Sequence, residues 1–363
     1  MQPCFILTGA SGAIGTQLLP SLMGRYPHSR VVALFRSRQA AEATAQCLPA
    51  TWRERLQSVV VDLTHDDAVQ QAVQQLPNMD KALAIHMAAD VSWDKSAEQL
   101  APLNVDGALR FAELLERVVR EPKLVFVSTA FTRMQGWSYR NGYEETKAAA
   151  QRALVEGFGR RNPLITYSCS LVVGSSNDGS ISRFHGIYPL IRFVARFNPP
   201  FVVGNKLGRF DLIPIDWAVQ QLLHAVELLD NGNAPTEVVA SAGDDRVSFE
   251  RLVALAIERL NFADAAVGIE PQAPPPILKR RQWDFLKRSL HAWRPAGVNE
   301  RDFRYFERLL DVYGQYAEND TSRPPLNVST LAPSPETYLP RVVDFWLRTQ
   351  HRPMAAKTVE LTA

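Results

Sequence analysis

Short apolar runs alternate with helix-length amphipathic segments through the first half of the chain. The runs are rich in β-branched residues and show little strict alternation, which is typical of strands buried on both faces of a parallel sheet. Strands separated by helical patterns form βαβ units, so we predict an α/β fold with a doubly wound parallel sheet of the Rossmann type. The first helix is expected at 13–23, and the strands at 5–7, 31–35, 59–61, 82–85, 124–127 and 164–173.

The second half is less regular. We expect a loop-rich excursion at 175–212, an amphipathic helix at 215–229 and a late strand at 237–240. Beyond about residue 245 the pattern becomes helical, and the last dozen residues look frayed. Prolines 271 and 274–276 mark a loop, and further helices are expected near 300–316 and 335–348.

Composition narrows the class of protein. Of 363 residues, 46% are hydrophobic and 21% charged, enough to build a core without disulfides or metals. The formal net charge of +2 argues against a nucleic-acid binder. Cys4, Cys47 and Cys169 are far apart and form no metal-binding pattern, which predicts reduced thiols, a cytoplasmic location and no metal. Neither a signal peptide nor a membrane span is expected.

A glycine-rich turn follows the first strand directly. Gly9 permits a tight turn, Gly12 lets backbone N–H groups approach a pyrophosphate, and Gly15 lets the helix pack closely on the strand. The helix N-terminus then faces the anion. A glycine turn without a ligand is the alternative, and the position after the first strand of a βαβ pattern disfavours it. The turn comprises Thr8, Gly9, Ala10, Ser11, Gly12, Ala13, Ile14 and Gly15.

The end of the second strand bears on the choice of cofactor. A site that prefers NAD usually has an acidic residue there, whereas this chain has Arg36, Ser37 and Arg38, donors suited to a 2′-phosphate. We therefore predict NADP, with two solvated arginines as the alternative. Asp62, after the third strand, either accepts a hydrogen bond from the adenine amine or caps a helix.

A hydroxyl, a phenol and an amine follow one another along the chain in an order that suits the reduction of a carbonyl group. Thr129 ends the fifth strand, and Tyr143 and Lys147 are four residues apart, so they share a face of a helix. The ammonium is expected to lower the phenol pKa towards the working range, and Lys147 can also hold the nicotinamide ribose. Thr129 can hydrogen-bond the substrate carbonyl. An inert surface Tyr/Lys pair is the alternative.

Three further features allow two interpretations. His86 is expected to be structural rather than a base or a ligand, and His185 either contacts substrate or is inert. The 279–288 segment could dock an acidic carrier protein or the phosphates of coenzyme A, although a solvated amphipathic helix with an aromatic core face is favoured. Its basic and aromatic members are Lys279, Arg280, Arg281, Trp283, Phe285, Lys287 and Arg288.

Taken together, these motifs resemble the extended short-chain dehydrogenase/reductase family over roughly the first 220 residues. The likeness is closest to thioester reductases and fatty acyl-CoA reductases, through Ser128–Phe131, Asn141–Lys147, Val172–Ser176, Phe184–Tyr188 and Asp211–Asp216. The resemblance implies catalysis by Thr129, Tyr143 and Lys147 and NADP along the carboxyl edge of the sheet. It further implies cofactor contacts or support from Leu63, Ala88, Ala89, Asn104, Val127, Leu171, Val172 and Val173.

The resemblance also implies an activity and a division of the chain. We expect an NADPH-dependent reductase that converts an acyl thioester, on coenzyme A or a carrier protein, to an aldehyde or further to an alcohol. A ketoreductase, a nucleotide-sugar epimerase or dehydratase, and a non-catalytic NADP-binding protein are the alternatives. The NADP-binding domain is expected at 1–174, with 213–242 returning to it, and the substrate-binding region at 175–212 and 243–363, in a monomer or a homodimer.

Two departures from the subgroup stand out. Ser168-Cys169 replaces an Arg-Pro pair, and the spacing from Thr129 to Tyr143 is short, which predicts a more open site or one covered by the C-terminal segment.

Overall fold

The computed structural model of the protein describes residues 4–133, 139–233, 235–290, 300–318 and 329–350. The chain divides into two compact units, each described here by itself. The first unit comprises residues 1–172, 215–243 and 324–332, and the second comprises 173–214, 244–323 and 333–363. That the first unit binds NADP and the second unit binds substrate stays a prediction.

An eight-stranded sheet forms the centre of the first unit. Its strand order is β14-β11-β6-β5-β4-β1-β2-β3, and each neighbouring pair is parallel. The order reverses between β1 and β4, and ligands of such sheets bind outside the carboxyl ends of the strands at this switch point. The strands are β1 (Cys4–Thr8), β2 (Val31–Phe35), β3 (Leu56–Val60), β4 (Met79–His86), β5 (Val119–Thr129), β6 (Leu164–Cys169), β11 (Glu237–Ser241) and β14 (Thr330–Leu331).

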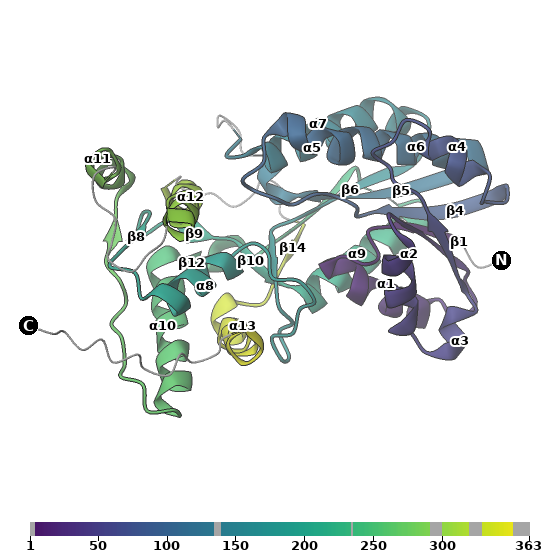
Figure 1. The fold of residues 1–363 in the computed structure, drawn as a ribbon. Helices are drawn as coiled ribbons and strands as arrows, with labels where there is room; N and C mark the ends of the chain where they lie inside the picture. The colour runs from purple at the N-terminus through teal and green to yellow at the C-terminus, as the bar shows by residue number, and fades with distance from the viewer. Residues whose placement is uncertain (1–3, 134–138, 234, 291–299, 319–328, 351–363) are drawn as a thin grey trace, which may run out of the picture. The chain divides into compact units, whose positions relative to one another are not determined.

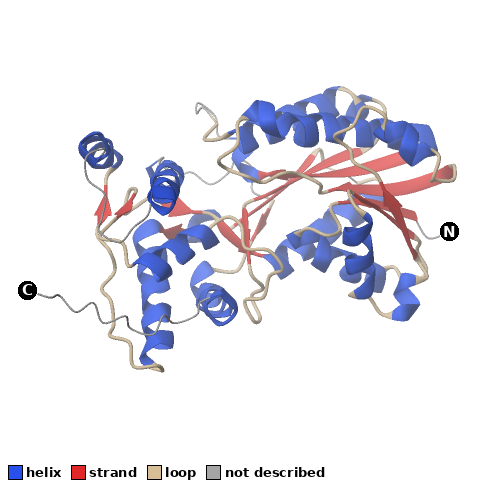
Figure 2. Ribbon diagram, in the orientation of Figure 1, coloured by secondary structure: helices blue, strands red, loops and turns tan. Residues whose placement is uncertain are grey.

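Helices cover both faces of this sheet (Figures 1 and 2). One face carries α4 (Ala68–Val73), α5 (Ala97–Ala101), α6 (Gly107–Val118) and α7 (Gly142–Glu156). The other carries α1 (Ala13–Arg25), α2 (Arg38–Gln46), α3 (Ala50–Arg53) and α9 (Ile215–Asp230). Fully buried Phe111 of α6 and Phe126 of β5 belong to the core beneath the first layer. The predicted doubly wound α/β class is confirmed.

The second unit is mostly helical. Two bidentate pairs join its helix at Phe249–Ala265 to its last helix, Arg251 with Glu336 and Arg259 with Asp344. Its helices are α8 (Tyr188–Phe197), α10 (Phe249–Ala265), α11 (Arg280–Leu290), α12 (Glu300–Glu318) and α13 (Pro335–Gln350). Its short strands pair as β8 (Val202–Val203) with β13 (Ile277–Leu278) and as β9 (Arg209–Phe210) with β12 (Val247–Ser248).

The structure corrects three sequence-based expectations. The loop-rich excursion at 175–212 contains the ten-residue helix α8, which has Pro189 in its first turn and buries Leu190, Ile191 and Val194. The sixth strand is interrupted at Ser170, so it divides into β6 and β7 (Leu171–Val173). β14 has only two residues, too few for a sequence signal. The last dozen residues lie outside the described part of the chain.

Candidate active site

The glycine turn fits against the end of β4 without space for side chains. Gly9 has φ +74°, and a Cβ there would lie 2.8 Å from the backbone nitrogen of Ala88. A Cβ on Gly15 would lie 2.2 Å from the carbonyl oxygen of Gly9. No side chain caps the N-terminus of α1 at Gly12. Since uncapped N–H groups and the helix dipole favour an anion there, the turn fits the pyrophosphate of a dinucleotide.

Thr8 and His86 join the ends of β1 and β4. The Thr8 hydroxyl oxygen accepts hydrogen bonds from the backbone N–H groups of Met87 (3.1 Å) and Ala88 (3.2 Å), and it lies 2.8 Å from His86 Nδ1. The Thr8 hydroxyl therefore donates to Nδ1. Burial, with help from the charge on Lys147, lowers the pKa of His86 to about 3, so this imidazole is neutral. These contacts favour the structural interpretation of His86.

The predicted cofactor-selecting residues lie at the carboxyl ends of β2 and β3. Arg36 and Arg38 are exposed, and no hydrogen bond or ion pair engages either one within the described ranges. Ser37 has a structural task, because its side chain accepts from Ala40 N at 3.3 Å and caps α2. Burial alone would raise the pKa of Asp62, but hydrogen bonds from the Thr64 N–H and hydroxyl outweigh it and lower that pKa.

Thr129, Tyr143 and Lys147 all belong to the first unit. Thr129 is the last residue of β5 and 4% exposed, while Tyr143 is the second residue of α7 and Lys147 follows one turn later. The helix begins at Gly142 because the Asn141 side chain caps it by accepting a hydrogen bond from Glu144 N at 3.0 Å. Lys147 is 2% exposed, and its Nζ lies 4.0 Å from the centroid of the Phe126 ring.

The protonation states of this pair differ from the expectation. Burial raises the pKa of the Tyr143 hydroxyl, and the nearby Cys169 and Glu144 raise it further. Burial lowers the pKa of Lys147 to about 7, against the opposing influence of Cys169. The predicted lowering of the phenol pKa by Lys147 is therefore wrong for this structure, because burial disfavours the charged phenolate. Tyr143 stays protonated at neutral pH, which is the form that donates a proton.

Cys169 affects the candidate catalytic pair. The sequence comparison with the subgroup marks this residue only as a departure from the usual Arg-Pro pair. It pairs with Thr129 in the register of β5 and β6, and its Sγ lies 3.6 Å from the Ser128 carbonyl oxygen. Cys169 raises the pKa of both Tyr143 and Lys147. The sequence pattern offered no spatial signal for this contact, since it depends on strand register.

A buried ion pair at the start of α7 was also missed. Arg140 Nη2 lies 2.6 Å from Glu144 Oε1, and the two side chains are 3% and 2% exposed. The Arg140 guanidinium also stacks 4.5 Å from the centroid of Phe131. Because Glu144 is adjacent to Tyr143, the pair holds the first turn of the helix in place. The four-residue spacing of opposite charges was a usable sequence signal.

Asn104 is 1% exposed on a π-helical turn, Pro102–Asp106. Its side chain accepts from Asp90 N at 2.8 Å and donates to Asp90 O at 3.0 Å and to Thr146 Oγ1 at 3.1 Å. It therefore ties the segment after β4 to α7, next to Lys147. Leu63 is a buried core residue that packs near Gly107.

The remaining predicted residues are placed as follows. Ala88, Ala89 and Val127 lie in the first unit at the carboxyl ends of β4 and β5, and Leu171 and Val172 lie there on β7. Val173 and the exposed His185 belong to the second unit. Residues 134–138 of the loop between Thr129 and Tyr143 lie outside the described residues, so the expectation about this loop stays a prediction.

Several side chains of the basic and aromatic segment at 279–288 contact other residues of the second unit. Trp283 is 2% exposed and donates from Nε1 to Asp311 Oδ1 at 2.9 Å. Lys287 donates to the other Asp311 oxygen at 2.5 Å, and Arg280 donates to the Asp311 carbonyl at 3.1 Å. Phe285 is exposed. The favoured interpretation, an amphipathic helix with an aromatic core face, describes α11.

Two features are absent from the described part of the chain. Among the described residues, no group of three His, Cys, Asp or Glu side chains could hold a metal ion. In the same part of the chain, no helix is both long and apolar enough to cross a bilayer.

The sheet order, the glycine turn and the Tyr143–Lys147 pair of α7 define an oxidoreductase of the extended short-chain dehydrogenase/reductase type that takes a nicotinamide cofactor. The male sterility protein family matches residues 7–137 and 132–222, more than half of the chain. The chain belongs to this family, which confirms the predicted resemblance.

Similar proteins extend this placement. Peramine synthetase A from Epichloe festucae (strain Fl1) is 29% identical over 202 residues, which cover 48% of this chain and 7% of that protein. The chain thus matches a small part of its curated relatives. Among solved structures, the terminal R domain of the myxalamid PKS-NRPS pathway has a TM-score of 0.65 at 16% identity, covering 98% of this chain and 92% of that one. An archaeal thiolation-reductase di-domain of a non-ribosomal peptide synthetase also scores 0.65 at 14% identity, covering 96% and 76%.

Proposed function

We propose that the protein is an NADPH-dependent reductase that converts an acyl thioester, linked to coenzyme A or to a carrier protein, to an aldehyde. One observation carries the proposal: the partly buried Tyr143 and the buried Lys147 lie one turn apart on α7, which packs against the strand that ends at Thr129, in a chain of the male sterility protein family. The sequence similarity to peramine synthetase A and the shared fold with two terminal reductase domains support the thioester as substrate.

The residues present fit a dinucleotide. The pyrophosphate would lie on the glycine turn and the N-terminus of α1, and Arg36 and Arg38 would hold the 2′-phosphate that distinguishes NADPH from NADH. Asp62 has one carboxylate oxygen, Oδ1, engaged by Thr64. When bound, the cofactor supplies the hydride.

The chain's own groups act on the oxygen of the carbonyl. Thr129 and Tyr143 would donate hydrogen bonds to it, which stabilises negative charge as it develops there. The proton then moves from the Tyr143 hydroxyl to that oxygen. The resulting hemithioacetal loses its thiol by cleavage of the C–S bond, which leaves an aldehyde. A second hydride and proton would give an alcohol.

The test is NADPH consumption with thioesters of coenzyme A and of a carrier protein, with products identified by mass spectrometry. An aldehyde or alcohol together with free thiol is expected. Turnover of ketones alone would favour the ketoreductase, and tightly bound NAD in purified protein would favour the epimerase or dehydratase. NADPH binding without oxidation of any acyl thioester, aldehyde or ketone would favour a non-catalytic protein.

Cofactor preference gives a direct prediction. Replacing both Arg36 and Arg38 by alanine should raise the KM for NADPH about ten- to a hundredfold and leave the KM for NADH nearly unchanged, because only NADPH carries the 2′-phosphate. Steady-state kinetics with both cofactors measures this. Arg160→Ala, an exposed arginine of the same unit, is the matched control. Equal losses with both cofactors would contradict the assignment. Ser37 is left intact because it caps α2.

The titration of Lys147 gives a second prediction. Its pKa is lowered by burial to about 7, so the amine is charged below that pH and neutral above it. If the charged form holds the ribose and the phenol, kcat/KM should fall as pH rises through about 7. Neither His86, with a pKa of about 3, nor Tyr143, with a raised pKa, titrates there.

The check is a pH profile from about pH 6 to about pH 9, measured also for Lys147→Arg. Arginine stays charged throughout this range, so the variant's residual activity should not fall near pH 7. A flat profile in the unaltered protein, or the same fall in the variant, would rule out Lys147 as its source.

A further inference from the structure

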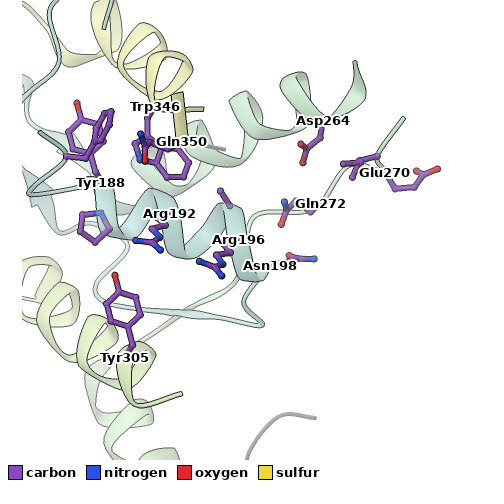
Figure 3. Close-up of a pocket in the computed structure, with 14 residues that line it drawn as sticks. Tyr188, Arg192, Arg196, Asn198, Asp264, Glu270, Gln272, Tyr305, Trp346 and Gln350 are labelled. Carbon is purple, nitrogen blue, oxygen red and sulfur yellow. The ribbon is translucent and has the colours of Figure 1, made fainter. Parts of the chain in front are cut away.

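A cavity of about 640 Å³ lies entirely within the second unit (Figure 3). Helix α8 forms one wall, and α12, α13 and the segment after α10 contribute others. Its volume lies in the range of small-molecule sites. The residues on which the argument rests are Tyr188, Arg192, Arg196, Gln272, Tyr305 and Trp346.

One wall of the cavity is cationic. Tyr188, Arg192 and Arg196 follow one another at four-residue intervals, so they share one side of α8, and Figure 3 shows the two arginines extending on that side, with Tyr305 opposite on α12. Arg192 is exposed, and within the described ranges its side chain has neither an ion-pair nor a hydrogen-bond partner. The acidic lining residues, Asp264 and Glu270, lie towards the other end in Figure 3. A guanidinium without a partner favours an anion, and phosphate matches its forked geometry.

A second feature of the cavity lining favours a ligand with an amide N–H group. The Gln272 Oε1 atom is buried and has no hydrogen-bond partner among the residues that the structure describes. The backbone of Gln272 is held on both sides by the Asn261 side chain, at 2.9 Å and 2.8 Å, so the side chain starts from a fixed position. A buried acceptor without a partner is costly, and a ligand N–H group would satisfy it.

Aromatic side chains also line the cavity. Tyr188 is 1% exposed, with its hydroxyl 2.9 Å from the Gly174 backbone nitrogen, so its position is fixed. Trp346 is 4% exposed on α13. Such walls suit methyl and methylene groups next to the anionic and amide parts of one ligand.

Phosphate, methyl groups and amides occur together in the phosphopantetheine arm. Resting on the proposed function, we propose that this cavity binds the phosphopantetheine arm of the thioester substrate, with Arg192 and Arg196 on its phosphate and Gln272 on an amide N–H. Coenzyme A and a carrier protein both present this arm. The basic segment at 279–288 is a weaker candidate, because Arg280 and Lys287 are already bound to Asp311.

Direct titration of the purified chain by calorimetry tests the proposal without any turnover. The probes are pantetheine 4′-phosphate, unphosphorylated pantetheine, coenzyme A, adenosine 3′,5′-diphosphate and inorganic phosphate. Arg192→Glu should weaken the binding of pantetheine 4′-phosphate by about ten- to a hundredfold and leave that of pantetheine nearly unchanged. The affinity for NADPH should not change. Arg281→Glu, an exposed arginine of the 279–288 segment that does not line the cavity, is the matched control and should bind like the unaltered protein.

The two sources of the arm give different results. Equal affinities for coenzyme A and pantetheine 4′-phosphate support recognition of the arm itself. A higher KM of Arg192→Glu for thioesters of both coenzyme A and the carrier protein would show that the cavity also recognises the arm in substrates. Binding of adenosine 3′,5′-diphosphate but not of pantetheine 4′-phosphate would overturn the proposal, as would a loss in Arg281→Glu with none in Arg192→Glu.

Failure of this proposal is distinguishable from failure of the proposed function. Thioester reduction with unchanged kinetics in Arg192→Glu would refute the cavity assignment alone. Binding of the phosphorylated arm that depends on Arg192, without reduction of any thioester, would refute the reductase alone.

Discussion

Replacing Tyr143 by phenylalanine should abolish most thioester reduction. We expect kcat to fall by about a hundredfold to ten-thousandfold, while the dissociation constant of NADPH stays nearly unchanged. The variant removes a single hydroxyl, the group that would donate the proton to the carbonyl oxygen. The ring remains, so the first turn of α7 and the Arg140–Glu144 pair beside it keep their packing. Stopped-flow or steady-state assays of NADPH oxidation measure the rate, and fluorescence titration measures the affinity.

The chain offers a matched control for this variant. Tyr139 lies four residues earlier, is 37% exposed and accepts a hydrogen bond from Arg152 at 3.1 Å. Tyr139→Phe removes the same atom outside the proposed chemistry and should keep nearly full activity. A Tyr143→Phe variant that turns over like the unaltered protein would exclude Tyr143 as the proton donor, and equal losses in both variants would point to the loop rather than to the chemistry.

Gly15→Ala should lower NADPH affinity about a hundredfold or more and destabilise the first unit by about 1–3 kcal/mol. The added Cβ would lie 2.2 Å from the Gly9 carbonyl oxygen and 2.6 Å from the Ala10 Cα, both backbone atoms that cannot move aside locally. Helix α1 would have to shift away from the turn, which takes its N-terminal N–H groups out of reach of a pyrophosphate. Denaturant unfolding and NADPH titration measure the two effects.

Gly24 is the control on the same helix. A Cβ there would lie 3.8 Å from the nearest atom, in the Trp52 ring, which is ordinary contact. Gly24→Ala should therefore stabilise the protein by about 0.5–1 kcal/mol, because alanine favours the helical backbone, and leave NADPH binding unchanged. Normal cofactor affinity in Gly15→Ala would show that the turn does not hold the dinucleotide.

Cys169 changes how the Tyr–Lys pair should be regarded. The Arg-Pro pair of the resembled subgroup would place a ring at this position, whereas here a thiol raises the pKa of both Tyr143 and Lys147. Burial nonetheless dominates both groups, in opposite directions. The result is a neutral phenol next to an amine that titrates near neutrality, which suits proton donation more than proton removal.

Local patterns were enough for most of the first unit. The apolar runs at 5–7, 31–35 and 124–127 became β1, β2 and the inner part of β5, because residues buried on both faces leave a continuous hydrophobic signal. Short elements were not predicted from the sequence. Helix α8 has ten residues between polar loops, and strand β14 has two residues. Their stability comes from packing against residues far away in the chain, which no local window contains.

By itself the sequence determined the parallel sheet, the glycine turn, the shared face of Tyr143 and Lys147 and the exposed arginines after β2, because each depends on residues within a few positions of one another. Only the tertiary structure decided the rest. It placed Cys169 beside Thr129 through strand register, and it buried Lys147 over Phe126. It paired Lys287 of the 279–288 segment with Asp311, and it brought four separate segments together to line the cavity that contains Arg192. Desolvation and long-range pairing set these features, and both arise only when distant parts of the chain come into contact.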